Sequence, residues 1–170
     1  MATTNSNFRF PSGSDLPDVP LWNSNLAADV ERSTATYSVS HSEAGMTSAP
    51  TGNLWLTNLV SDLKLGNVTF AASGITIVIP GVYEVVHRAR MASTGAAQSQ
   101  LSIGLGTTII ATSFLVFGAA GNISQTVQYI GQFAAGNVIQ FGWNQPTASV
   151  VSYTGGATAN ISTVRLIRAV

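Results

Sequence analysis

The sequence predicts an all-β protein, a β-sandwich or jelly roll that follows an extended N-terminal arm and one short helix. From residue 51 onward, short runs of β-branched and aromatic residues alternate with Gly, Pro and Asn. Short strands at this spacing are typical of sandwiches and jelly rolls. We therefore divide the chain into an arm and helix over residues 1–33, a linker over 34–50 and a β head over 51–170.

The arm comprises residues 1–20. Pro11, Pro17 and Pro20 exclude a regular helix or a central strand there. The arm is too short to bury its apolar residues by itself, so we expect it to dock on another surface. Its first residues are polar and uncharged, which does not fit a secretory signal peptide.

A short helix is expected from Asn23 to Arg32. Asn23 or Ser24 can cap it, and Leu26, Ala27 and Val30 fall on one face. Residues 34–50 are rich in Ser, Thr, Ala and Gly and form the expected linker, with one strand from Thr36 to Ser40.

The β head contains ten runs with strand-like composition. They are Leu54–Leu59, Asn67–Ala71, Ile75–Ile79, Val82–Met91, Gln100–Leu105, Thr108–Val116, Ser124–Phe133, Val138–Trp143, Ser149–Tyr153 and Ala159–Ile167. Leu54–Leu65 also fits one face of a helix, and we favour strand. Pro80 and Gly81 are expected to end one strand and permit the bend before the next.

The composition predicts association. Only 8% of residues are Asp, Glu, Lys or Arg, against about 25% in a typical soluble domain. The formal net charge is zero, so free monomers would repel one another little. All seven acids lie at or before Glu84, and only four arginines follow it. Four arginines are too few to predict nucleic-acid binding.

Side chains for catalysis or metal binding are scarce. The chain has no cysteine and two histidines, His41 and His87. Asp62 and Glu84 are the only carboxylates of the β head, whereas glycosidases need a close pair. Asp15 and Asp18 are too few for calcium. We expect no enzyme activity, no cofactor and no metal, and the lack of a long apolar run predicts no membrane span.

The N-terminal segment resembles a known module. The stretch Phe10-Pro11-Ser12-Gly13-Ser14-Asp15, followed by a helix with the pair Leu26-Ala27, looks like the start of minor tail, head-fibre and related structural proteins of phages that infect actinobacteria. The resemblance implies a virion-docking role for seven residues. They are Phe8, Phe10, Pro11, Asp15, Leu16, Leu26 and Val30.

The β head resembles a second family. The run Ile79-Pro80-Gly81-Val82-Tyr83 is similar to a strand of the trimeric jelly rolls of the tumour-necrosis-factor and complement globular-head type. Ile103–Ile109, Ala134–Ile139 and Ser162–Arg168 resemble further segments of that family in the same order, with Asn137 in place of its usual Asp. The resemblance implies a jelly roll that packs as a homotrimer around an apolar axis. Six aromatic residues are expected in the trimer interface or the core: Tyr83, Phe114, Tyr129, Phe133, Phe141 and Trp143.

Together these features predict a non-enzymatic virion protein on the exterior of a phage particle. The first interpretation is a trimeric capsid decoration or head-fibre protein whose arm binds the major capsid protein. The alternative is a tail-fibre or baseplate adhesin that contacts tail or baseplate proteins and binds a host-surface glycan.

Overall fold

A computed structural model of the chain is made of β-strands and their connections, with no helix among the residues that it describes. Those residues are 2–3, 9–10, 36–41, 54–57, 59–65, 68–144, 151–153 and 160–170.

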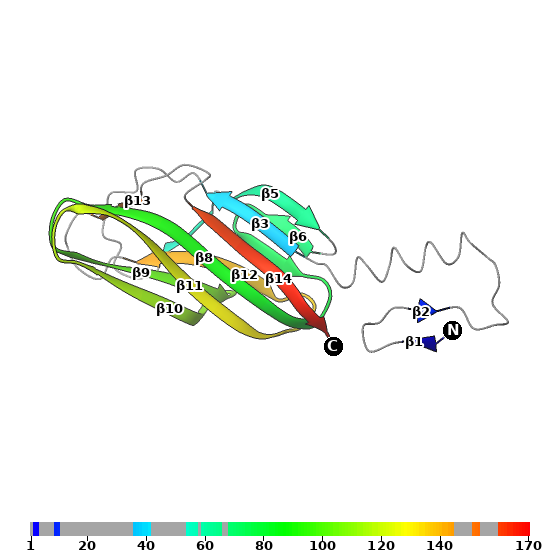
Figure 1. The fold of residues 1–170 in the computed structure, drawn as a ribbon. Helices are drawn as coiled ribbons and strands as arrows, with labels where there is room; N and C mark the ends of the chain where they lie inside the picture. The colour runs from blue at the N-terminus through cyan, green and yellow to red at the C-terminus, as the bar shows by residue number, and fades with distance from the viewer. Residues whose placement is uncertain are drawn as a thin grey trace.

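Two antiparallel sheets contain most of the described strands (Figure 1). The first, here called the β9 sheet, has the order β10 (Thr108–Phe117), β9 (Ala97–Leu105), β12 (Val138–Asn144), β7 (Gly74–Ile77) and β6 (Val68–Ala71), and β4 (Leu54–Trp55) also pairs with β12. The second, the β8 sheet, has the order β11 (Gly121–Phe133), β8 (Gly81–Ser93), β14 (Ile161–Ala169), β3 (Thr36–His41) and β5 (Leu59–Leu65), and β13 (Val151–Tyr153) also pairs with β8. Separately, β1 (Ala2–Thr3) pairs with β2 (Arg9–Phe10).

The two sheets enclose one apolar core, as in a β-sandwich. Alternation along β8 points Tyr83, Val85 and Met91 inward, because successive side chains of a strand face opposite ways. From the β9 sheet, Phe141 and Trp143 enter the same core, and both are fully buried. Burial of such large side chains contributes about 1.5–3 kcal/mol each to folding.

Strand pairing in the chain is nested. β9 pairs with β10, β8 with β11, β7 with β12, and β3 with β14. Each outer pair therefore brackets the inner ones in the sequence, as in one long hairpin folded over itself. The innermost turn places Gly106 at φ 56°, a left-handed conformation that glycine adopts without strain.

Gly81 allows a close approach between β8 and β14. A Cβ atom there would lie 2.5 Å from the carbonyl oxygen of Arg168 and 2.6 Å from Cδ1 of Leu166. The Pro80–Gly81 pair thus does more than permit a bend, since only glycine fits against the backbone of β14.

A turn at residues 134–137 joins β11 to β12, where the sequence predicted one. Gly136 takes φ 84°, and the Ala134 amide donates to Oδ1 of Asn137 at 2.9 Å. Asn137 therefore serves as a turn former here.

The prediction of an all-β fold is confirmed for the described residues. Leu54–Leu65 forms β4 and β5, so strand was the right choice over helix, although the break falls within the expected strand Leu54–Leu59. The strand expected in the linker is β3. The expected helix Asn23–Arg32 lies outside the described residues.

Candidate assembly surface

The structure separates the six aromatic residues that the sequence grouped as interface or core. Tyr83, Phe133, Phe141 and Trp143 are buried in the core. Tyr129 is half-buried, with its ring centroid 5.9 Å from that of Phe133 in an edge-to-face arrangement. Phe114 is 64% exposed, and it alone of the six projects largely into solvent.

Phe114 belongs to a larger group of exposed apolar residues on β10 and β11. Ile109 and Val116 accompany it on β10, and Ile123 and Ile130 lie on β11. Val116 is 67% exposed and Ile130 57%. The two strands are the end strands of their sheets and run beside each other along one side of the molecule (Figure 1). We call these five residues the β10–β11 edge.

The β10–β11 edge has apolar side chains on both faces of β10. In the run Phe114-Leu115-Val116-Phe117, Leu115 and Phe117 pack toward the core while Phe114 and Val116 face away from it. Strands that are apolar on both faces are ordinarily covered on both faces. This exposed side of β10 therefore has the composition of a surface that is buried in an assembly.

The edge also carries no charge. No Asp, Glu, Lys, Arg or His occurs from Met91 to Val164. Soluble proteins commonly protect an end strand against pairing with other chains by charged residues or proline, and β10 has neither. The backbone groups along the free side of β10 and its apolar side chains both favour coverage by another polypeptide.

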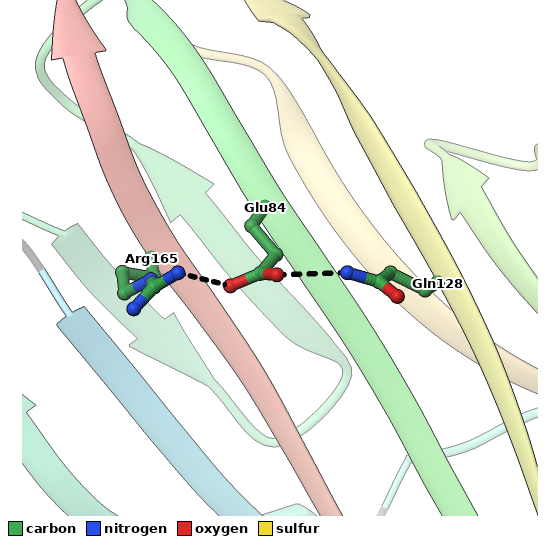
Figure 2. A network of polar contacts seen from close by, with 3 residues as sticks. All are labelled: Glu84, Gln128 and Arg165. Carbon is green, nitrogen blue, oxygen red and sulfur yellow. Dashed lines mark hydrogen bonds and ion pairs between the residues drawn. The ribbon is translucent and has the colours of Figure 1, made fainter.

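Charged groups gather on the outer face of the β8 sheet, where Ile130 of the edge pairs with Glu84 in the strand register. Glu84 on β8 forms an ion pair with Arg165 on β14 at 2.7 Å (Figure 2). It also accepts a hydrogen bond from Nε2 of Gln128 on β11 at 2.7 Å. This network links three neighbouring strands. Arg165 is exposed, so we expect the ion pair to contribute about 0–1 kcal/mol. Both carboxylate oxygens of Glu84 are engaged.

The buried histidine is part of the core. His87 faces inward on β8, its Nδ1 lies 2.7 Å from Oγ of Ser162, and its ring centroid lies 5.2 Å from that of Phe141. Glu84 faces the other way on the same strand. In the described part of the chain, no group of three or more acidic or histidine side chains could hold a metal ion.

Sequence reasoning singled out Phe114 but missed the other members of the edge. The sequence does carry a signal for them, because the long uncharged run from Met91 to Val164 contains all four, namely Ile109, Val116, Ile123 and Ile130. Of the arm residues assigned to docking, Phe10 lies in β2, opposite Ala2. The others, namely Phe8, Pro11, Asp15, Leu16, Leu26 and Val30, lie outside the described residues.

The described residues include no helix that is long and apolar enough to cross a membrane. No protein-family model matches the chain, and no curated protein matches it either.

Proposed function

We propose that the chain is a non-enzymatic structural protein of a tailed bacteriophage, displayed on the exterior of the virion as a homotrimeric capsid decoration or head-fibre protein. The N-terminal arm attaches it to the major capsid protein, and the β head forms the trimer. The observation that carries this proposal is the β10–β11 edge, an uncharged and exposed apolar surface along two end strands.

The β head is, in this proposal, a jelly roll of the tumour-necrosis-factor and complement globular-head type. The nested pairing of β9–β10, β8–β11, β7–β12 and β3–β14 supports it, because a jelly roll is a long antiparallel hairpin wrapped into two sheets. The resemblance of Ile79–Tyr83 to a strand of that family gives the same assignment.

A closed trimer would explain why the β10–β11 edge is apolar. Oligomers of one chain usually adopt closed symmetry, and a ring of three would cover the β10–β11 edge of every copy. We expect such an interface to bury more than about 2,000 Å² in total, as stable homo-oligomers do.

The oligomeric state tests the proposal directly. Native mass spectrometry of the full chain at micromolar concentration should give three times the chain mass of 17.6 kDa. Val116→Lys should give monomers, because a charge would then have to be buried in the interface. Thr94→Lys, which adds the same charge at an exposed turn residue, should remain trimeric.

A monomeric wild-type protein at that concentration would contradict the trimer. A Val116→Lys variant that stays trimeric would contradict the assignment of the interface to this edge. Circular dichroism of both variants should match the wild type, since neither position is in the core.

The second candidate is a tail-fibre or baseplate adhesin for a host-surface glycan. The surface around Trp55, described below, favours it. Stoichiometry in purified virions separates the two candidates, since decoration proteins are present in many copies and tail adhesins in few.

A further inference from the structure

We propose that the outer face of the β9 sheet, around Trp55, binds a neutral carbohydrate. The proposal does not rest on the virion role. The surface adjoins the β10 part of the β10–β11 edge, because Gln100 of β9 pairs with both Phe114 of β10 and Asn144 of β12. We call this surface the Trp55 platform and define it as Trp55, Ser102, Gly104, Gln140, Gly142 and Asn144.

Alternation places these residues on one face. Leu101 and Ile103 of β9 point into the core, so Ser102 and Gly104 face the other way. On β12, Phe141 and Trp143 point into the core, and Gln140, Gly142 and Asn144 face away from it. The register places Gly142 between Trp55 on β4 and Ser102 on β9.

The indole of Trp55 lies across the glycines. Its Cη2 and Cζ3 atoms occupy the position that a Cβ at Gly104 would take. Since β12 separates β4 from β9, the ring crosses β12 at Gly142 to reach Gly104. Trp55 is half-buried, so Gly104 lets the ring lie against the sheet while part of it stays open to solvent.

Three polar atoms of this face lack partners. Oγ of Ser102, Oε1 of Gln140 and Oδ1 of Asn144 are buried and have no hydrogen-bond partner in the described part of the chain. Ser102 is fully buried. The amide nitrogen of Gln140 donates to the Ser73 carbonyl at 3.3 Å, which leaves its oxygen for another group. Unsatisfied buried polar groups are uncommon and costly, and these three lie within two neighbouring strands.

The chemistry of these atoms indicates the ligand. Two of them are amide oxygens, which only accept hydrogen bonds, so the ligand must supply donors. The ligand should also be uncharged, because none of the six residues carries a charge that could pair with it. A tryptophan ring offers an apolar face on which the C–H face of a sugar can pack, with polar contacts at its rim. A carbohydrate rich in hydroxyls meets all three conditions.

Gln140 and Asn144 are the expected hydrogen-bonding residues. Both are half-buried and lie on β12, on either side of Gly142. Trp55 supplies the stacking surface, and Ser102 is fully buried beneath this face.

Binding is tested on the full-length protein with defined polymers. Dextran, mannan, arabinogalactan and a β-1,3-glucan serve as neutral probes, and dextran sulfate serves as the charged comparison. The Trp22→Phe background leaves Trp55 and the fully buried Trp143 as the fluorophores, so a change in emission on titration reports Trp55. At least one neutral polymer should shift the emission and should retard the protein in affinity electrophoresis.

Substitutions then locate the site. Gln140→Ala and Asn144→Ala should each weaken binding about three- to tenfold, the effect of one net hydrogen bond. Trp55→Ala should weaken it by about tenfold or more, and Trp55→Phe should keep most of the affinity because an aromatic face remains. Thr163→Ala, on the outer face of the β8 sheet, is the matched control and should have no effect.

The outcomes distinguish this site from the trimer. Variants of the Trp55 platform should stay trimeric, and Val116→Lys should lose the trimer. Failure of all four neutral polymers to bind would overturn the proposal. So would binding of dextran sulfate that depends on Arg88, because the ligand would then lie on the other sheet. Should Trp55→Ala not fold, the Gln140 and Asn144 variants still decide the question.

Discussion

Two hydrogen bonds show how polar side chains are accommodated in the core. Nε1 of Trp143 donates to Oγ of Ser99 at 3.1 Å, and Nε2 of Gln125 donates to the Ser113 carbonyl at 2.6 Å. These bonds offset the cost of removing the polar groups from water. The sequence does not reveal them, because a Ser or Gln between apolar residues looks the same on either face of a strand.

Tyr83 is the buried residue with the clearest dependence on pH. Its hydroxyl donates to the Ile79 carbonyl at 2.7 Å, and burial raises its pKa from 10.0 to about 12. The unfolded chain therefore loses this proton at a lower pH than the folded protein. The contribution of Tyr83 to stability is complete below about pH 10 and is lost between about pH 10 and 12, by about 2–3 kcal/mol.

We therefore expect Tyr83→Phe to flatten the alkaline decline in stability. At neutral pH the variant should be less stable by about 1 kcal/mol, because the Ile79 carbonyl loses its donor. Chemical denaturation at pH 8 and pH 11 measures both effects. Tyr129→Phe is the control, since it retains Tyr83 and should keep the decline. If Tyr83→Phe and wild type lost the same free energy of unfolding between pH 8 and pH 11, this account would be contradicted.

At the scale of elements, the strands were predictable and their ends were less so. The run Thr108–Val116 was expected and β10 is Thr108–Phe117, because β-branched and aromatic residues fill it. β8, β9 and β11 extend beyond the predicted runs, mostly into Ala, Ser, Gln, Gly and Asn residues. Their lengths are set by pairing with neighbours, as in the continuous register of β8 with β11 from Gly81–Phe133 to Ser93–Gly121. Local sequence cannot predict these strand lengths.

The close approach of β8 and β14 makes Gly81 sensitive to substitution. Gly81→Ala should lower the free energy of unfolding by about 1–3 kcal/mol, because the methyl group would meet the Arg168 carbonyl and the Leu166 side chain. Gly118→Ala is the matched control, since a Cβ there has no atom within 4 Å. Thermal melts of both variants measure the difference. Equal melting temperatures would mean that β14 moves aside without cost.

At the scale of the whole molecule, the assembly surface was only partly predictable. Apolar residues on β10 were evident in the sequence, yet Phe114 and Phe133 looked alike until their strands were paired. Phe114 faces away from the core on β10, whereas Phe133 faces into the core on β11. The Trp55 platform was not predicted at all, because it depends on the register of β4, β12 and β9, three strands that are distant in sequence.

The proposed anchor is tested by deletion of residues 1–19. The shortened protein should stay folded and trimeric, because the β10–β11 edge lies outside the deletion. It should no longer join virions, since Phe8, Phe10 and Leu16 are the apolar residues proposed to dock. Co-sedimentation with particles that lack the protein measures attachment. Decoration as complete as that of the full chain would place the anchor elsewhere.

The nested pairing also gives the molecule two unlike ends. Thr36 pairs with Arg165, and Gly81 pairs with Ala169, so the chain enters β3 and leaves β14 at the same end. Ser93 pairs with Gly121, which places the turns at residues 94–96 and 118–120 at the opposite end. Foreign peptides inserted at Ala119 would therefore be presented at the end opposite to the one where the chain enters β3. A fusion to Val170 would instead lie at the end where the chain enters β3, so the first position suits display better.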